Sequence, residues 1–485
     1  MFTGALTLIV FLPLAGVLLL ISGPWKDKEV RYIAGAFTLA TFGLALTAFF
    51  RFDLGAEGLQ FVEQYEWIPG LGIKYFMGVD GLSMPMVLLT ALIFAVATIA
   101  SWSINLRVKE YFIWIMLLET GVMGVFTSQD FIQFFLFWEV EVAPMFFLIS
   151  IWGTGRKEYS AMKFLIYTLG GSAFMLVGIL VLGFSAGTFD MVELASMELH
   201  IAFLSIEAVF FLIFVAFAVK LPVWPLHTWL PDAHTDAPTA VSVILAGILL
   251  KMGGYGFIRI SLSIFPEVAG DFAWFLVSFA VVNILYGAVV TIQQKDMKRL
   301  IAFSSISHMG FVLLGVGSLG EIGVTGAALQ MFTHGTITGL LFLLVGLVYD
   351  KTHTRYIPDL KGLVHRMPIT AVVFAVAGLA ALGIPSMSGF ASELLVFLGT
   401  FPEWRAATIL GVIGIVLTAG YILWMIQRVF FGPSDERFSQ VGDVIAREMV
   451  PLAPMVGAIF LVGIYPAILT DMLRGGIVPI ISRLG

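Results

Sequence analysis

The chain has 485 residues, of which 59% are hydrophobic and only 12% are charged, and its mean hydropathy is +1.00. A soluble domain ordinarily carries about 25% charged residues, so the composition excludes a protein whose whole surface faces water. The formal net charge of −6 is small for this length and gives no sign of a nucleic-acid partner. Cysteine is absent, which excludes iron–sulfur clusters, thiolate metal sites and disulfides within this chain.

Apolar segments of ~18 or more residues recur along nearly the whole chain, and each is long enough to cross a membrane as a helix. We therefore predict an all-α polytopic membrane protein with about fourteen transmembrane helices. The first segment, Thr3 to Ile21, has no basic residue before it and no small-residue cleavage pattern after it, so we expect a retained span rather than a signal peptide. The predicted span centres lie near residues 12, 40, 91, 118, 140, 173, 216, 250, 282, 309, 337, 384, 417 and 460.

The basic residues are divided unevenly between alternate loops. One set of loops holds most of them, whereas the other set is acidic, as in "RFDLGAEGLQFVEQYEW". Because basic loops stay in the cytoplasm, we predict that both termini face outward. We expect a bacterial inner membrane, with an energy-transducing organelle membrane as the alternative. The basic set comprises Lys26, Lys28, Arg31, Arg107, Lys109, Arg156, Lys157, Lys163, Lys295, Lys298, Arg299, Lys351, Arg355, Lys361, Arg366, Arg428, Arg437 and Arg447.

Two stretches match at a constant offset: "FLIYTLGGSAFMLVG" from Phe164 and "FTHGTITGLLFLLVG" from Phe332. Such matches between apolar helices are common by chance, but in both copies proline interrupts the next predicted span. The first interruption holds Pro222 and Pro225, and the second holds Pro385 in "LGIPSMSGF". We therefore predict two inverted five-helix repeats, each with a broken helix, an arrangement that places ion sites near the midplane in many transporters.

These observations divide the chain into four segments. Residues 1–105 form an N-terminal three-span segment, 106–265 the first five-helix repeat, 270–432 the second repeat, and 445–485 a C-terminal span. The longest connection, Arg51 to Gly78, is under thirty residues, so we expect no separate soluble domain.

Ionisable residues near the predicted span centres are the strongest indication of function. A buried charge costs at least ~2.5 to 3.5 kcal/mol even on the mildest insertion scale. We therefore predict that these residues are paired, hydrated or neutral, and that they serve the function. They are Glu139 in "LFWEVEVAP", Lys220 in "AFAVKLPVW", Lys251 in "ILLKMGGYG", His308 in "SISHMGF" and Glu393 in "GFASELLVF", together with His334 in "FTHGTIT".

Structural interpretations of some of these residues stay open. Glu139 and Lys220 are also explained by an ion pair that ties two spans together, and His308 or His334 by hydrogen bonds in helix packing. Glu141 lies about 200° around the helix from Glu139, so the two carboxylates cannot face one partner. Of the two glutamates, we favour Glu139 as the functional one.

Lys220 lies two residues before Pro222, near the C-terminal end of a predicted half-helix. Exposed carbonyls there favour its ammonium form, whereas desolvation favours the neutral amine. We therefore predict a lysine that changes protonation state when a nearby carboxylate moves or is neutralised. Beyond the break, we expect a cytoplasmic mouth of a hydrated path, formed by His227, Asp232, His234 and Asp236. Metal ligation by the two histidines is a disfavoured alternative, because no ligand spacing is defined.

The stretch "GVGSLG" from Gly315 to Gly320 fits the G-x-G-x-x-G pattern of dinucleotide-binding proteins. It follows a predicted span and no βαβ unit surrounds it, so we interpret it as a helix-end turn. No flavin or haem signature is present. The sequence predicts neither a cofactor-binding site nor a metal site in this chain.

Several stretches resemble the antiporter-like membrane subunits of complex I, the proton-pumping NADH–quinone oxidoreductase. The resemblance covers predicted spans three to fourteen, and it is closest to the subunit M (subunit 4) branch. Glu393 stands where the L and N branches usually have lysine, and the chain ends without the long lateral helix of subunit L. The stretches are "FFLFWEVEVAPMFFLISIWG", "KFLIYTLGGSAFML", "KLPVWPLHTWLPDAHTDAPTAVSVILAGILLKMGGYGFIR", "DMKRLIAFSSISHMGF" and "GIPSMSGFASELL".

This resemblance implies a proton-translocating subunit coupled to redox chemistry in other subunits. The implied partners are homologous antiporter-like subunits, the rest of a complex I type assembly, membrane lipid and protons. The resemblance implies that Glu139 is the span-five glutamate that modulates Lys220, and that Lys251 is a central relay lysine. It also implies that His308 and His334 are parts of a hydrated axis, and that Glu393 is a terminal site toward the outer face.

Two other functions share some of these features. A subunit of a multisubunit cation/proton antiporter, or of a related membrane-bound hydrogenase, carries the same motifs. A stand-alone solute transporter is disfavoured, because the ionisable residues follow successive spans in a line instead of clustering around one substrate.

Overall fold

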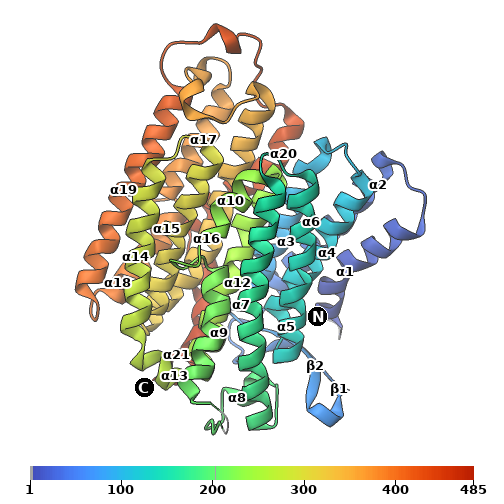
Figure 1. Cartoon of the computed structure of the whole chain (residues 1–485), viewed down its shortest axis with the longest axis vertical. Helices are drawn as coiled ribbons and strands as arrows, with labels where there is room; N and C mark the ends of the chain where they lie inside the picture. The colour runs from blue at the N-terminus through green and yellow to red at the C-terminus, as the bar shows by residue number, and fades with distance from the viewer. Residues whose placement is uncertain (1–3, 202–203, 485) are drawn as a thin grey trace.

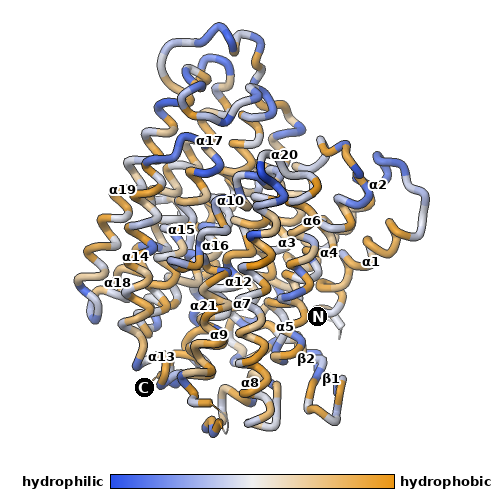
Figure 2. Tube along the Cα trace, viewed as in Figure 1, coloured by the Kyte–Doolittle hydropathy of each residue, from blue (hydrophilic) through white to orange (hydrophobic). Residues whose placement is uncertain are grey.

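Membrane-length helices make up most of the chain in the computed structural model, which describes residues 4–201 and 204–484. They run roughly side by side in Figure 1, and Figure 2 shows hydrophobic residues along most of their length. The predicted all-α polytopic membrane protein is confirmed. Among the described residues, twelve helical segments are long and apolar enough to cross a membrane. They are α1 (Ala5–Ser22), α2 (Asp27–Phe50), α3 (Ser83–Ala100) with the 3₁₀ turn η2 (Ser101–Ser103), α4 (Val108–Thr127), α5 (Phe131–Val140) with α6 (Val142–Trp152), α7 (Lys157–Ala186), α11 (Thr239–Ile244) with η3 (Leu245–Leu249), α12 (Leu250–Gly256) and η4 (Phe257–Leu262), α14 (Ala273–Ile292), α15 (Met297–Val316), α16 (Glu321–Thr352), α19 (Arg405–Phe430) and α20 (Ala446–Ile464).

Two further predicted spans are interrupted, as their prolines indicate. Proline lacks a backbone N–H and clashes with the preceding turn, so a regular helix does not continue through it. The count of fourteen crossings, the inverted relation of the repeats and the four segment boundaries stay predictions. The interruptions lie between α9 (Ile206–Lys220) and α10 (Trp229–Asp236), and between α17 (Pro368–Ala381) and α18 (Ser388–Thr400).

Short elements join the long helices. The helix α21 begins directly after Pro466, whereas the sequence predicted a single last span without this separate helix. The segment "GVGSLG" spans the end of α15 and the turn before α16, so its interpretation as a helix-end turn is confirmed. The short elements are α8 (Met191–Leu194), α13 (Pro266–Asp271), α21 (Ala467–Ile481), and the 3₁₀ turns η1 (Pro69–Leu71), η5 (Ile357–Asp359), η6 (Leu363–His365) and η7 (Glu436–Phe438).

A β-hairpin, which the sequence analysis treated as a loop, occupies the connection between α2 and α3. Strands β1 (Gln60–Ile68) and β2 (Ile73–Val79) pair in antiparallel orientation. Lys74 in β2 donates a hydrogen bond of 3.0 Å to Asp190, the N-cap of α8, and this bond raises the pKa of Lys74. The hairpin is thereby joined to the loop region that precedes α9.

The interior of the bundle is formed by three helical segments. The apolar windows of Thr239–Leu262 and Glu321–Thr352 are completely buried, and that of Met297–Val316 is 94% buried, whereas only 28% of the window in Ala446–Ile464 is buried. An all-round hydrophobic helix is normally buried in a larger structure or faces lipid. The three interior segments carry Lys251, His334 and His308, so these residues lie away from the surrounding lipid.

The two ends of the described chain lie in the lower half of Figure 1, on the side of the β-hairpin, α8 and α13. The loop between α19 and α20 lies at the opposite, upper end, and the hydrophilic residues that begin α2 lie toward the same end in Figure 2. The lysines and arginines that the sequence analysis assigned to the cytoplasm include those of this upper end. Which end faces the cytoplasm stays a prediction.

Asp443 fastens this upper loop to the start of α17. Its carboxylate accepts hydrogen bonds from the backbone N–H of Ile369 (2.7 Å) and from the hydroxyl (2.7 Å) and N–H (3.2 Å) of Thr370. Burial by itself raises the pKa of Asp443, but these hydrogen bonds outweigh it and lower the pKa below the ordinary value. A lowered pKa means that the stabilisation is present at neutral pH and is lost as the pH falls below about 4.

We expect Asp443→Ala to destabilise the protein by about 1 to 3 kcal/mol at pH 7, because several donors lose a charged acceptor. Glu436→Ala, which removes an exposed carboxylate from the same loop, should change the stability by less than ~0.5 kcal/mol. Thermal unfolding of the two purified variants in detergent measures the difference. Equal melting temperatures would contradict a fastening role for Asp443.

Candidate functional site

Buried ionisable residues lie on successive elements across the middle of the bundle. In Figure 1, α5 and α6 lie to the right of α12, and α16, α15 and α18 follow toward the left, with α9 below α16. From α9 through α12, α16 and α15 to α18, each element packs against the next. The buried side chains are Glu141, Lys220, Lys251, His334, His308 and Glu393.

Lys220 is the last residue of α9, because the chain leaves the helix at the prolines that follow it. The backbone groups released by this break find partners within the protein. The indole N–H of Trp229 donates to the carbonyl of Val219 at 2.9 Å. Asn283 of α14 accepts from the N–H of Trp224 at 2.7 Å and donates to the carbonyl of Pro222 at 3.1 Å. The break is therefore a defined structure held from a neighbouring helix.

Lys220 pairs with Glu141, and not with Glu139. The Nζ atom of Lys220 forms a buried ion pair and hydrogen bond with Oε1 of Glu141, and it lies 5.3 Å from the centre of the Trp138 ring. Glu139 is only partly buried and has no ion pair among the described residues. The expected contact between Glu139 and Lys220 is wrong, whereas the functional role of Glu139 stays a prediction.

The reason lies in the rotation of the helix that holds both glutamates. Its sequence is hydrophobic on all sides, so periodicity does not fix which glutamate faces inward. The helix is also interrupted at Glu141, because Pro144 has no N–H to donate to the carbonyl of Val140. Gly121 of α4 lets the chain approach closely here, since a Cβ at that position would lie 3.2 Å from the N atom of Glu141. Packing against α4 decides the orientation.

Lys251 lies at the centre of the first interior span, between two π-helical turns. The segments η3 and η4 flank α12, and such π turns occur frequently at functional sites. The Nζ atom of Lys251 donates to the carbonyl of Ala246 in η3 and lies 2.7 Å from Nδ1 of His334. The side chain is therefore held between a backbone carbonyl of the first π turn and an imidazole.

Two histidines continue from Lys251 to the second broken helix. The ring centres of His334 and His308 are 5.5 Å apart, and Nδ1 of His308 lies 3.4 Å from Oε1 of Glu393. We call the four residues Lys251, His334, His308 and Glu393 the buried line. The structure thus brings together four of the six residues that the sequence analysis selected, and the line ends at the second helix break.

Several atoms of these groups are buried without a hydrogen-bond partner among the described residues. Buried polar atoms ordinarily have a partner, which is often an ordered water molecule. A row of polar atoms that the protein leaves free suits a hydrated path. The atoms are both ring nitrogens of His308, Nε2 of His334, Oε2 of Glu393, Oε2 of Glu141 and Oε1 of Glu139.

Gly383 shapes the position of Glu393 at the second break. Its φ angle is +68°, a conformation that favours glycine, and a Cβ at this position would lie 2.4 Å from Oε2 of Glu393. Ser392, next to Glu393, is held separately through its hydroxyl, which lies 2.9 Å from that of Thr333 in α16. The carboxylate therefore occupies space that only a glycine leaves open.

The polar residues that follow the first break are dispersed. Asp232 pairs with Lys163 at 2.8 Å and with Arg299 at 3.4 Å, and Asp236 accepts from the hydroxyl of Ser160 at 2.6 Å. The other two members of the expected mouth are apart from these pairs. His227 lies 3.3 Å from the hydroxyl of Tyr286, and the ring of His234 stacks on Phe342 at 4.8 Å. Their joint role as a mouth stays a prediction.

A further carboxylate that is buried inside a span was not predicted. Glu119 in α4 is completely buried, and neither of its oxygens has a hydrogen-bond partner within residues 4–201 and 204–484. Its position near the predicted span centre at residue 118 was the available indication, since an ionisable residue inside a span is a functional candidate.

Comparisons with known proteins identify related chains. The family described as "NADH:quinone oxidoreductase/Mrp antiporter, TM" matches residues 128–418, and the family described as "NADH-ubiquinone oxidoreductase chain 4, amino terminus" matches residues 35–123. The chain is 41% identical to NADH-quinone oxidoreductase subunit M of Rhodobacter capsulatus, over 99% of this chain and 96% of the relative. It is 42% identical to NAD(P)H-quinone oxidoreductase chain 4 of Gloeobacter violaceus, over 96% and 90% of the two chains.

Solved structures show the same architecture. A chain of respiratory complex I from Thermus thermophilus superimposes with a TM-score of 0.88 at 29% identity, over 99% of this chain and all of that chain. A chain of the Mrp complex from Dietzia superimposes with a TM-score of 0.87 at 21% identity, over 99% and 97%. At this low identity, the second likeness shows a shared fold alone.

We expect Gly383→Ala to displace the carboxylate of Glu393 and to lengthen its 3.4 Å approach to His308, because an added methyl group would overlap Oε2. Gly420→Ala is the matched control, since nothing lies within 4 Å of a Cβ at that position of α19. A structure of each variant measures the displacement, and thermal unfolding should show a loss of about 1 to 3 kcal/mol for Gly383→Ala only. An unmoved Glu393 would contradict this account.

Proposed function

The chain belongs to the family of NADH–quinone oxidoreductase subunits M and chain 4, and from this premise we propose that its buried line carries the translocated protons. It is a proton-translocating subunit of a complex I type assembly and is accompanied there by other antiporter-like membrane subunits. We propose below which residues move the protons and how this movement is coupled to the rest of the assembly.

The continuity of the buried line carries this proposal. Lys251, His334 and His308 follow one another within direct or water-bridged reach, and Glu393 ends the series at the second break. A proton passes along such a series when neighbouring groups alternately accept and release it. Amine, imidazole and carboxylate groups all exchange protons, so each member is chemically competent for transfer.

The ion pair of Lys220 and Glu141 supplies the coupling element. A buried pair holds its charges through mutual attraction, and removal of one charge leaves the other without compensation. Protonation of Glu141 therefore releases Lys220, whose ammonium then acts on the next groups toward Lys251. The sequence analysis assigned this part to Glu139, and the geometry favours Glu141 for it.

We further propose that this chain performs no redox chemistry itself. It has no cysteine for an iron–sulfur cluster, and its ionisable residues form a proton path. Electron transfer then takes place in other subunits, and the energy reaches this chain through contacts with its neighbours. The basic loops face the bacterial cytoplasm and both termini face outward in this proposal.

A cation/proton antiporter subunit is the competing function, because the fold is shared with a chain of an Mrp complex. The match to the amino-terminal family of chain 4 and the identity of 41% to a subunit M favour the redox-driven assembly. Purification of the chain with its natural partners, followed by their identification, separates these possibilities. Partners that carry quinone and iron–sulfur sites support our proposal, and their absence from an intact assembly would contradict it.

We expect Lys251→Ala to leave the assembly intact and to reduce proton translocation by at least about tenfold per assembled complex, because a relay amine is lost. Lys251→Arg should impair translocation too, since arginine stays protonated at any accessible pH. Proton uptake by vesicles during NADH oxidation, normalised to assembled complex, is the measurement. Lys361→Ala, which removes an exposed lysine, is the control and should translocate normally.

We expect Glu141→Gln to reduce coupled proton translocation more than Glu139→Gln, because only Glu141 pairs with Lys220.

The exchange Glu141→Lys with Lys220→Glu tests whether the ion pair couples proton transfer or only holds two helices together. If the pair only joins two helices, the exchanged protein should both assemble and pump. If Lys220 must release a proton at the end of α9, the exchanged protein should assemble and pump poorly, because a carboxylate there meets the partial negative charge of the released carbonyls.

The proton-pumping rate and the amount of assembled complex are measured for each single variant and for the exchanged protein. Near-normal pumping by the exchanged protein would reject the coupling role of the pair. A greater loss in Glu139→Gln than in Glu141→Gln would reject the choice of Glu141.

A further inference from the structure

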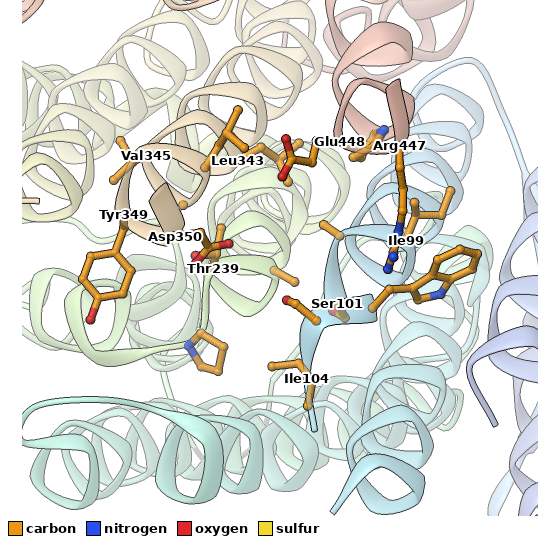
Figure 3. Close-up of a pocket in the computed structure, with 18 of the residues that line it drawn as sticks. Ile99, Ser101, Ile104, Thr239, Leu343, Val345, Tyr349, Asp350, Arg447 and Glu448 are labelled. Atoms are coloured by element: carbon orange, nitrogen blue, oxygen red, sulfur yellow. The ribbon is translucent and has the colours of Figure 1, made fainter. Parts of the chain in front are cut away.

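A second polar feature lies apart from the buried line, at the end of the bundle that carries the basic loops. A cavity of about 880 Å³ opens there among the starts of α2, α11 and α20 and the ends of α3 and α16. Figure 3 shows the side chains of Arg447, Asp350 and Ile104 on different sides of its open centre. The proton path proposed above does not use this cavity.

Positive charge prevails at the walls of the cavity. One basic group, Arg355, is already paired with Asp296 at 2.6 Å, and one acidic group, Glu448, with Lys351 at 3.0 Å. Among the described residues, the remaining groups have no ion pair. Lys28, Arg31 and Arg447 are basic and at least partly exposed, Lys298 is buried against the carbonyl of Ala237, and Asp350 is acidic. The basic wall residues are Lys28, Arg31, Lys298, Arg355 and Arg447, and the acidic ones are Asp350 and Glu448.

Two arginines, Arg31 and Arg447, lie on one wall of the cavity. The Nη2 atom of Arg31 donates to the carbonyl of Ile104 (2.8 Å) and to Oδ1 of Asn105 (2.9 Å), which fixes the guanidinium. The guanidinium of Arg447 lies 5.2 Å from the Trp102 ring on the same wall. Guanidinium groups suit the oxygens of a phosphate group, which they can bind in a bidentate manner.

Apolar surface continues from the cavity along two outer helices. The apolar windows of α2 and α20 are only 39% and 28% buried, and both helices expose large hydrophobic side chains such as Leu39 and Leu461. Tyr32 and Trp102 line the cavity at the level where the helices end, which is where aromatic residues favour a membrane interface. A ligand with a charged head and apolar tails matches this combination.

We propose that the cavity binds the phosphate headgroup of an anionic phospholipid, whose acyl chains lie against α2 and α20. Basic pockets between transmembrane helices on the cytoplasmic side are suited to such headgroups. Free phosphate offers the same oxygens, but it would leave the adjoining apolar surface unused. The lipid would join α20, at the C-terminal end of the chain, to α2 and α3, at the N-terminal end.

The test uses the whole purified assembly and a photoactivatable anionic phospholipid, phosphatidylglycerol with a diazirine in one acyl chain. We expect labelled peptides from α2 and α20, against which the acyl chains lie, with saturation at low lipid concentration. The double variant Arg31→Gln with Arg447→Gln should raise the half-saturating concentration about thirtyfold, which corresponds to ~2 kcal/mol for two lost charges. Arg428→Gln is the matched control, because Arg428 also lies over a tryptophan ring, that of Trp424, but does not line the cavity.

Three results would reject the proposed lipid site. Equal labelling by a zwitterionic phosphatidylcholine probe would reject an anion site, and competition by inorganic phosphate at millimolar concentration would reject the lipid as its source. Protection of the two peptides by a neighbouring subunit, with no labelling of the intact assembly, would also reject the proposal.

Single variants test the lipid site if the double variant does not fold or assemble. If the double variant fails to assemble, Lys28→Gln and Arg447→Gln are tested singly, because both side chains are exposed and are not needed for packing. Each should raise the half-saturating lipid concentration about fivefold, ~1 kcal/mol per charge. Unchanged labelling in both single variants would overturn the assignment.

Discussion

Backbone groups that leave a helix inside a membrane must find partners within the protein, and the rest of this structure depends on that constraint. The break after Lys220 persists because Asn283 and Trp229 satisfy the groups that the prolines release. An unsatisfied buried polar group would cost about 1 to 3 kcal/mol, which is a large part of a protein's net stability. The helix α14 must therefore lie against the break, and this placement in turn orients its neighbour α15, which carries His308.

The same constraint explains where the ionisable residues lie. Lys251, His334 and His308 belong to the three most buried spans, where their neighbours along the buried line are other polar groups. On the outer helices, a charge at this depth would face lipid directly. Two kinds of local irregularity adjoin the line, since π turns flank Lys251 and the second break lies beside Glu393. Each irregularity therefore lies beside a member of the buried line.

The structure separates two groups of buried ionisable residues in space. The pair of Lys220 and Glu141 joins the first broken helix to the helix before it, whereas the buried line connects the first interior span to the second broken helix. The basic cavity lies apart from both, where α2 and α20 meet the interface region. The chain thus combines a polar interior with largely apolar outer helices.

The sequence by itself determined the membrane class, the two broken helices and most members of the site, because hydropathy, proline chemistry and the cost of a buried charge act locally. The resemblance of its motifs also indicated the family. Only the tertiary structure decided that Glu141 rather than Glu139 meets Lys220, since the rotation of an all-hydrophobic helix is fixed by packing against α4. The sequence did not predict the β-hairpin or the separate helix α21, because their short patterns resemble a loop and a part of a span. The contacts along the buried line join residues up to 85 positions apart, from His308 to Glu393, and no local pattern encodes such distances.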